Sequence, residues 1–384
     1  MQTIKIMDED LSNKIAAGEV VESLMSVVKE LVENSIDANS SIIKIYLSDS
    51  GIKSIKVVDN GKGMSREDAS CCILRHATSK LYTKDDLFNI NTLGFRGEAM
   101  PSIASVSQMI IKTSDGEEST KIIVKRGTVE EIKSTDLRGG TTIEVSDIFY
   151  NTPARFKYLK SLHTELSNIT NYVNKMALAN PEISFYLEND GKVLLNTDGS
   201  SNLLKVINSI YGLEVTKKML KVERSSSDYK VTGYISYPEI NRSSRNNITL
   251  LVNGRYVRNN DITRTILDGY HTYLPINRYP IVVLNIEADP YIIDVNIHPT
   301  KMDIKFSKIE ELKEMIFSLV SESLNKLTLI PEAKYEPRPI SNIVTVTTLN
   351  EKIDVKEEKT CDTPEEKVKF EELNFDFDND YTIS

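Results

Sequence analysis

Apolar side chains recur at helical spacing through residues 12–38 and predict an amphipathic helix with charged residues on its other face. Two apolar runs follow, at residues 41–49 and 52–59, with Ser50-Gly51 between them. This arrangement predicts a hairpin of two strands. The apolar positions of the helix are Val20, Val21, Leu24, Val27, Val28, Leu31 and Val32, with the small Ser35 in line.

The periodic pattern weakens after the hairpin. Ser65 followed by Asp68 resembles a capping box and predicts a helix over about 66–75. Residues 76–98 hold few periodic apolar positions, so we expect a long loop, here called the lid.

Strand-like alternation returns after the lid, in four segments between residues 106 and 149. Thr152-Pro153 then predicts the start of one helix that runs to about Asn180, because proline suits the first helical position. Strands at 183–196 complete a first domain, which we place at residues 1–203.

A second domain is predicted over residues 204–330. Its helices are expected at 203–211, 260–273 and 308–326, and its strands at 230–237, 248–253 and 280–287. From Pro331 onward prolines and acidic clusters replace the apolar pattern, so residues 331–384 are predicted to be a disordered acidic linker or tail. The segment 368–378 alternates apolar and acidic residues and is alternatively a partner-binding peptide.

The composition excludes several classes of protein. At 384 residues with 40% hydrophobic and 27% charged residues, the chain is typical of a globular protein of two domains. No apolar run approaches the ~18 residues of a membrane span, and the first residues resemble no secretory signal. The 3 cysteines lack metal-site spacing, which favours reduced thiols, no structural zinc and a cytoplasmic location.

The charge is unevenly distributed. The formal net charge is −9, but residues 331–384 alone hold 7 basic and 14 acidic side chains. Subtracting these from the totals of 47 and 56 leaves 40 basic and 42 acidic residues in 1–330. The predicted domains are therefore nearly neutral, and a local basic surface for nucleic acid is compatible with the acidic total.

Glu30 and Asn34 are four residues apart on the first predicted helix and share a face. An amide oxygen suits magnesium, which keeps waters and phosphate oxygens as its other ligands. A glutamate one turn away can orient or deprotonate a water. The alternative is a solvated helix face, because Lys29 and Glu33 also have the spacing of an ion pair.

Three short segments provide further candidate chemistry. Asp59 is an acceptor that can take the amino group of adenine, and Gly61 and Gly63 allow a ligand close to the backbone. An ordinary β-turn is the alternative reading of this segment. The segments 78–80 and 94–98 supply hydroxyls, cations and backbone N–H groups for phosphate, although no Walker pattern occurs.

The second predicted domain contributes basic residues. Lys301 follows a His-Pro-Thr turn, where its ammonium can reach a phosphate or simply be solvated. A group of arginines forms either a surface that follows DNA phosphates or scattered surface charge. These arginines are Arg242, Arg245, Arg255, Arg258, Arg264 and Arg278.

Taken together, the motifs resemble the amino-terminal part of MutL-type DNA mismatch repair proteins, within the wider GHKL ATPase group. The segments are IAAGEVVE, KELVENSIDA, DNGKGM, RHATSK, LGFRGEA, FYNTPARFKYL, VNGRYVRN and DVNIHPTK. GFRGEA and NTPAR are narrower than the general pattern of the group. The resemblance covers residues 1 to about 330 and implies a Bergerat-type α/β (α+β) sandwich, then a transducer domain with a ribosomal-protein-like βαβ fold.

The resemblance also implies roles for individual residues. Glu30 resembles the general base, Asn34 the magnesium ligand, and Asp59 the reader of adenine, with Thr142 supporting the base. Lys301 resembles the second-domain lysine that senses the γ-phosphate. The implied ATP-binding set is Asn34, Asp59, Gly61, Gly63, Met64, Thr78, Ser79, Lys80, Leu93, Gly94, Phe95, Arg96, Gly97, Glu98 and Thr142.

The implied function is an ATP-binding and ATP-hydrolysing mismatch repair protein with ATP and Mg²⁺ as cofactors. ATP would order the lid and the arm at about 1–20, and two chains would pair as a homodimer. The implied partners are DNA, a mismatch-recognition protein and downstream repair factors, with no membrane. A scaffold that binds ATP and DNA with negligible turnover is the alternative. A chaperone or sensor kinase does not account for NTPAR.

The chain departs from the family pattern at two segments. Residues 22–26 read ESLMS where members carry Arg-Pro, and Met100-Pro101 follows GEA, which predicts that the helix after the lid begins one turn late. The carboxy-terminal dimerisation domain and the endonuclease motif of some members are not found here. We therefore expect no nuclease activity, and a chain that is either a fragment or a short gene product.

Overall fold

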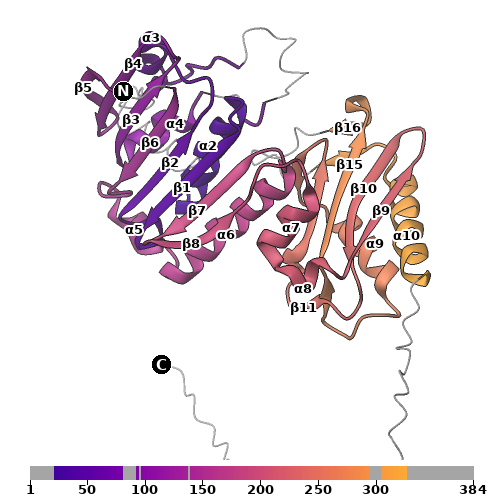
Figure 1. Ribbon diagram of the computed structural model, residues 1–384. Helices are drawn as coiled ribbons and strands as arrows, with labels where there is room; N and C mark the ends of the chain where they lie inside the picture. The colour runs from indigo at the N-terminus through magenta and orange to yellow at the C-terminus, as the bar shows by residue number, and fades with distance from the viewer. Residues whose placement is uncertain (1–20, 81–91, 95–96, 137–138, 295–303, 327–384) are drawn as a thin grey trace, which may run out of the picture. The chain divides into compact units, whose positions relative to one another are not determined.

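The computed structural model describes residues 21–80, 92–94, 97–136, 139–294 and 304–326 (Figure 1). These residues belong to one compact unit that contains two large sheets. The domain limits predicted at 203 and 204 remain a prediction, and the predicted tail and N-terminal arm lie outside the described residues. Among those described, no helix has the length and apolar character to cross a bilayer.

The first sheet has eight strands in the order β5-β4-β3-β6-β2-β1-β7-β8. Neighbouring strands are antiparallel, except that β1 and β7 are parallel. The strands alternate buried and more exposed residues, so one face carries the core. The bounds are β1 Ile42–Ser48, β2 Ser54–Asp59, β3 Gln108–Ser114, β4 Ser119–Lys125, β5 Thr128–Ser134, β6 Gly140–Ser146, β7 Ser184–Asn189 and β8 Lys192–Asn196.

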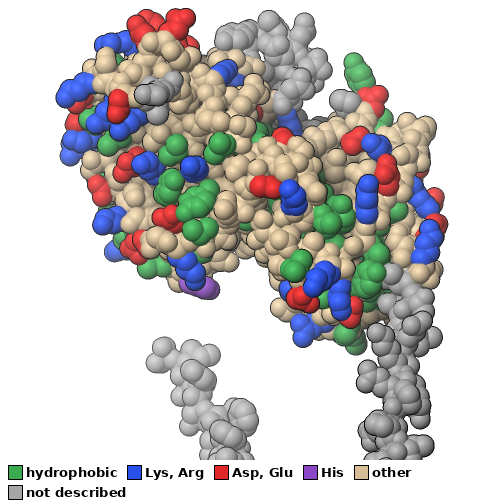
Figure 2. Space-filling view, in the orientation of Figure 1, with side chains coloured by type: hydrophobic (Ala, Val, Ile, Leu, Met, Phe, Trp, Pro, Cys, Tyr) green, Lys and Arg blue, Asp and Glu red, His purple; other side chains and the backbone are tan. Residues whose placement is uncertain are grey.

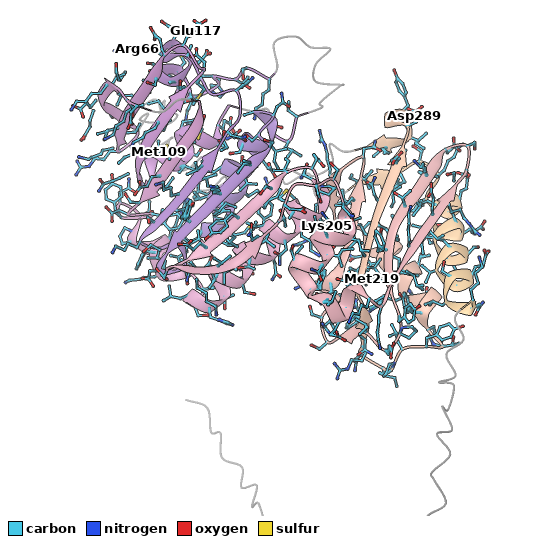
Figure 3. The ribbon with its side chains drawn as sticks, in the orientation of Figure 1. Arg66, Met109, Glu117, Lys205, Met219 and Asp289 are labelled. Atoms are coloured by element: carbon cyan, nitrogen blue, oxygen red, sulfur yellow. The ribbon has the colours of Figure 1, made fainter. Side chains whose placement is uncertain are left out.

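Helices cover that buried face and complete a two-layer α/β sandwich, as predicted (Figure 1). They pack on each other and on the strands around side chains such as Met109 of β3, labelled in Figure 3. The helices of this region are α2 Leu24–Asp37, α3 Arg66–Cys71, α4 Ala99–Ser105, α5 Pro153–Tyr158 and α6 Leu162–Ala179, and the 3₁₀ turn η1 Asp49–Gly51 joins β1 to β2.

Helix α2 begins later than its apolar pattern predicted. Residues 21–23 are not helical, and the side chain of Ser23 accepts a hydrogen bond from the N–H of Ser26 as the N-cap. Residues 12–20 lie outside the described part. The buried positions of α2 from Leu24 to Ser35 are the predicted ones.

Two helix predictions were wrong. The helix expected from Pro153 to about Asn180 is two helices, because Leu159 is extended and Ser161 starts a new N-cap by accepting from the N–H of Thr164. Helix α4 begins at Ala99 rather than one turn late. Pro101 fits in its first turn, where backbone N–H groups have no partner within the helix.

The second sheet has five strands in the order β13-β12-β15-β10-β9, with α9 and α10 packed on it. Its core is separate from the first, although Val283 of β15 lies in the first core. Strands β9 and β13 and the short α8 were not predicted; Met219, labelled in Figure 3, begins β9. The large-sheet strands are β9 Met219–Ser225, β10 Tyr229–Ser236, β12 Ile248–Val252, β13 Arg255–Val257 and β15 Val282–Ala288.

Helices and short strands complete this region. Helix α7 matches its predicted bounds, and α9 and α10 lie within theirs. The helices are α7 Leu203–Tyr211, α8 Leu213–Thr216, α9 Asn260–Tyr270 and α10 Ile309–Asn325, with 3₁₀ turns η3 Arg245–Asn247 and η4 Pro290–Ile292. Two short pairs are β11 Asn241–Arg242 with β14 Tyr279–Pro280, and β16 Ile293–Asp294 with β17 Lys305–Phe306.

Candidate nucleotide-binding site

The polar face of α2 forms the centre of the candidate site. Glu30, Asn34 and Asp37 follow one another at helical spacing on this face. Asn34 Oδ1 accepts a hydrogen bond from Lys80 Nζ at 2.8 Å. The same ammonium lies 2.6 Å from Asp37 Oδ2, whose side chain is only 5% exposed. The amide oxygen predicted to hold a metal is therefore positioned to face a cation.

Asp37 also holds the main chain of the LGFRGEA segment. Its Oδ1 accepts from the N–H of Leu93 at 2.8 Å and its Oδ2 from the N–H of Gly94 at 3.0 Å. Sequence reasoning assigned no role to Asp37. Its position three residues after Asn34 was the available signal, because that spacing puts both on one helix face.

A second group of charges lies around Glu30. Lys29 Nζ donates to Glu30 Oε1 at 3.0 Å and to Glu33 Oε2 at 3.2 Å. Tyr172 of α6 donates to Glu33 Oε1 at 3.2 Å. Burial raises the pKa of Glu33, and the neighbouring Lys29 opposes that rise. Burial alone would lower the pKa of Lys29, but the two carboxylates outweigh it and the pKa is raised.

Asp59 ends β2 and is held from several directions. Its carboxylate accepts from the hydroxyls of Ser35 at 2.9 Å and Ser40 at 3.3 Å, and from the N–H of Gly61 at 2.9 Å. Burial raises the pKa of Asp59, and these hydrogen bonds offset part of the rise. The carboxylate thus has a fixed orientation at the end of a strand.

The threonine that accompanies Asp59 is Thr141 and not the predicted Thr142. Asp59 pairs with Thr141 across β2 and β6, so the two share a face of the sheet, while Thr142 pairs with Val58. The Thr141 hydroxyl also lies 3.0 Å from that of Thr113. Successive strand residues point to opposite faces, which places Thr142 on the other side of the sheet.

The glycines of DNGKGM are required by close packing. A Cβ on Gly61 would lie 2.6 Å from Ser40 Oγ, and one on Gly63 would lie 1.9 Å from the carbonyl of Ser114. Gly63 also has φ of 66°. Met64 continues the loop, and its N–H donates to Thr113 Oγ1 at 2.9 Å. This loop is therefore packed tightly beside Asp59.

The remaining lid residues are partly described. The N–H of Lys80 bonds to Thr78 Oγ1 at 3.2 Å, and Ser79 is exposed. Gly97 has φ of 61°, and Glu98 is the N-cap residue of α4 without a side-chain cap bond. Phe95, Arg96 and Lys301 lie outside the described residues.

The predicted arginine group divides into exposed and half-buried members. Arg258 and Arg264 are exposed and, with Arg245, line a cleft of about 620 Å³ beside Tyr256 and Asn259. Arg245 stacks 5.1 Å from the ring of Tyr279. On the face shown in Figure 2, basic and acidic side chains are intermixed over both sheets. The three arginines are therefore grouped locally at this cleft.

The exposed Arg242 and Arg278 do not line this cleft. Arg255 differs from all the others, because it is half-buried and its Nη2 donates to the carbonyl of Thr92 at 3.2 Å. The prediction that Arg255 belongs to a DNA-facing surface is therefore corrected: it faces the candidate nucleotide site.

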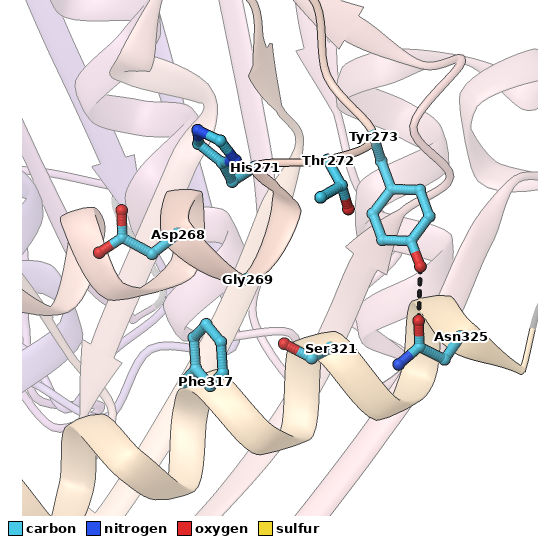
Figure 4. A pocket seen from close by; sticks show the side chains of 8 residues that line it. All are labelled: Asp268, Gly269, His271, Thr272, Tyr273, Phe317, Ser321 and Asn325. Atoms are coloured by element: carbon cyan, nitrogen blue, oxygen red, sulfur yellow. Dashed lines mark hydrogen bonds between the residues drawn. The ribbon is translucent and has the colours of Figure 1, made fainter.

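A smaller hollow of about 330 Å³ lies between the end of α9 and α10 (Figure 4). His271 and Phe317 line it, and Tyr273 donates to Asn325 Oδ1 at 2.5 Å across one side. It contains none of the predicted site residues. Within the described ranges, no group of three or more His, Cys, Asp or Glu residues forms a metal-binding cluster.

Comparison with protein families gives two matches along the chain. Residues 21–151 match the model for histidine kinase-, DNA gyrase B- and HSP90-like ATPases, and residues 207–325 match the DNA mismatch repair protein, C-terminal domain. A DNA mismatch repair protein MutL from Geobacillus sp. (strain WCH70) is 52% identical over 344 residues, which are 88% of this chain and 56% of that protein. The chain belongs to the MutL family of DNA mismatch repair proteins. The family resemblance of the motifs is thereby confirmed.

A second MutL relative shows a similar identity and coverage. The MutL protein of Listeria monocytogenes serovar 1/2a (strain ATCC BAA-679 / EGD-e) is 52% identical over 329 residues, 85% of this chain and 55% of its own length. The chain thus spans about half the length of the curated relatives it matches.

Solved structures agree on the fold. The crystal structure of the N-terminal domain of a DNA repair protein has a TM-score of 0.71 at 27% identity, over 82% of this chain and 97% of that one. The Aquifex aeolicus MutL ATPase domain complexed with ADP has a TM-score of 0.57 at 24% identity, over 77% and 98%. The predicted GHKL-type fold is confirmed.

Proposed function

We propose that this chain binds ATP with Mg²⁺ and hydrolyses it, as the nucleotide-dependent part of a mismatch repair protein. The observation that carries the proposal is the convergence on α2: Glu30 and Asn34 share its polar face, and Lys80 reaches Asn34 from the lid. Asp59, fixed at the end of β2, is the proposed reader of the adenine amino group.

The residues around Asn34 fit a magnesium ion. Lys80 Nζ lies on Asn34 Oδ1, so a positive charge already occupies the direction in which this oxygen points. A bound Mg²⁺ would neutralise phosphate charge there. The Lys80 ammonium and a metal ion cannot both occupy the same lone-pair direction of Asn34 Oδ1. Lys80 would therefore turn from Asn34 toward phosphate oxygens when nucleotide binds.

Glu30 is the proposed general base. One of its oxygens is engaged by Lys29 at 3.0 Å, which fixes the carboxylate and leaves the second oxygen for a water. Phosphate binding would use the N–H groups of Leu93 and Gly94, which Asp37 now occupies. We therefore propose that these two N–H groups donate to Asp37 without nucleotide and to phosphate oxygens when nucleotide is bound.

The test compares Glu30→Ala with Glu67→Ala, an exposed glutamate in the first turn of α3. Steady-state ATP hydrolysis should fall by roughly 10²–10⁴-fold in Glu30→Ala and stay unchanged in the control. ADP affinity, measured by calorimetry, should change little in either. An unchanged hydrolysis rate in Glu30→Ala would exclude it as the base. Nucleotide binding without turnover in the unmodified chain would support the scaffold alternative.

DNA is the proposed macromolecular ligand, and the cleft lined by Arg245, Arg258 and Arg264 favours this assignment. Guanidinium groups hold phosphates in a bidentate manner, and Tyr256 at the same cleft adds an aromatic face. Family membership alone supports the rest of the proposal. These parts are ATP-driven homodimerisation, contacts with a mismatch-recognition protein and downstream repair factors, and a cytoplasmic location.

A further inference from the structure

Arg255 is carried by a rigid part of the five-stranded sheet. It begins β13 after the Asn253-Gly254 turn, whose φ angles of 47° and 79° suit a tight hairpin. The side chain of Asn253 fixes this turn to β15. Its Nδ2 donates to the carbonyl of Ala288 and its Oδ1 accepts from the N–H of Ala288, each at 3.0 Å. The position of the arginine backbone is therefore set by the sheet.

The side chain of Arg255 reaches the segment that approaches α2. Its Nη2 donates to the carbonyl of Thr92 at 3.2 Å. The next two residues, Leu93 and Gly94, donate their N–H groups to Asp37, and Thr92 Oγ1 donates to the carbonyl of Gly94 at 2.8 Å. The three-residue segment is thus held from one side by α2 and from the other by β13.

The charges in this network complement one another. Asp37 is almost fully buried and takes the Lys80 ammonium as well as two backbone N–H groups. Burial lowers the pKa of Arg255, and the carboxylates of Asp37 and Glu33 oppose that change. The guanidinium therefore lies in the field of two acidic residues of α2, which favours its charged form.

We propose that Arg255 is a positioning residue of the nucleotide site: it holds the main chain of Thr92, Leu93 and Gly94 in place against α2. The edge of the five-stranded sheet is thereby linked to the proposed phosphate-binding segment by a contact that does not involve Lys301. The inference rests on the proposed ATP binding, and it gives Arg255 a function different from DNA contact.

The test uses Arg255→Gln, with Arg224→Gln as the matched control. Arg224 is on β9, at the opposite edge of the same sheet, in a surface ion pair with Glu322. Arg255→Gln should weaken ADP binding, measured by calorimetry, by roughly tenfold or more, because a charged hydrogen bond is lost. Hydrogen exchange of the 92–94 backbone in the nucleotide-free protein should become faster. The control should change neither.

The conservative change Arg255→Lys should recover part of both effects, because an ammonium can still donate to the Thr92 carbonyl. This recovery separates positioning from a general loss of folding, which thermal unfolding of each variant also reports. If Arg255→Gln does not fold, the comparison is made with Arg255→Lys and Asp37→Asn, singly and combined. A non-additive effect on ADP affinity then supports the network, and additive effects contradict it.

The outcomes separate this inference from the proposed function. The positioning role would be overturned if the unmodified protein binds ADP and Arg255→Gln has the same ADP affinity and the same hydrogen-exchange rate at residues 92–94. Unmodified protein that binds no nucleotide would overturn the proposed function instead. In that case unchanged exchange at 92–94 in Arg255→Gln would also overturn the inference, whereas faster exchange would retain the structural link.

Discussion

The polar face of α2 and the arginine-lined cleft of the second sheet use charged residues in opposite ways. On α2, Asp37 and Glu33 are largely buried, and each has at least two hydrogen-bond partners. In the cleft, Arg258 and Arg264 are exposed, and Arg258 Nε donates to the hydroxyl of Tyr256 over a long 3.4 Å. The first arrangement fixes geometry and the second provides charge.

This difference indicates how each region should respond to change. A buried carboxylate with fixed donors tolerates little substitution, because each lost bond leaves a donor unsatisfied. Exposed guanidinium groups act through the electrostatic field around the cleft, so several residues together determine the attraction for a charged ligand. Changes on the α2 side should therefore be large and specific, and changes in the cleft small and dependent on salt.

The largest predicted effect on ligand binding is at Asp59. Asp59→Asn should reduce ATP affinity by roughly 100-fold and weaken the preference for ATP over GTP, because the amide no longer presents two acceptors to an amino group. Asp198→Asn, on an exposed turn, is the control. Calorimetric titration with both nucleotides measures the effect. Equal ATP affinities for Asp59→Asn and the unmodified protein would remove Asp59 from the adenine site.

A smaller effect is predicted at Lys175, which connects helix α6 to the second sheet. Its ammonium, on α6, donates to the Asn246 carbonyl and to Thr249 Oγ1, each at 2.6 Å. Burial, and then Arg258, lower its pKa from 10.5 to about 8. Between these values the unfolded chain binds more protons than the folded one, so stability should rise with pH across this window.

Lys175→Met should lack that rise. The difference in free energy of unfolding between the two proteins should change by about 1 kcal/mol per pH unit in this range. Urea unfolding at several pH values measures it, with the exposed Lys205→Met as control. If the free energy of unfolding changes with pH in the same way in both proteins, burial does not lower the pKa of Lys175.

The smallest effects are predicted in the arginine cleft. Arg258→Gln and Arg264→Gln should each weaken DNA binding a few-fold and reduce the slope of log affinity against log salt by about 1. ADP affinity should not change in either variant. Fluorescence anisotropy with a labelled duplex at several salt concentrations measures this. Salt-independent binding would show that the cleft does not contact phosphates.

Local patterns in the sequence predicted much of the fold. Helix α7 and strand β12 match because their apolar positions suffice to define them. The break between α5 and α6 was missed, because the periodic pattern continues through the extended Leu159. Strand β9 was missed because its mixed charged sequence is that of an edge strand, where pairing on one side decides the structure.

The candidate site shows the same limit. Glu30 and Asn34 were proposed from helical spacing together with the family resemblance, and the structure places both on the polar face of α2. Thr141 was confused with its neighbour, because only the β2–β6 register decides which threonine faces Asp59. Tyr172 reaches Glu33 from 139 residues away, and no local signal marks that contact. Arg255 could not be distinguished from the exposed arginines, because burial decides its role and burial depends on tertiary structure.

The parallel pairing of β1 with β7 has a consequence for how the chain folds during synthesis. Ile42 pairs with Ser184 and Leu47 with Asn189. One edge of β1 therefore stays unpaired until residues about 140 positions later in the chain have been synthesised. A fragment that ended at residue 151, the limit of the ATPase family match, would contain β1 without this partner. We expect such a fragment to expose an unpaired strand edge and to aggregate, whereas one extending past β8 should fold.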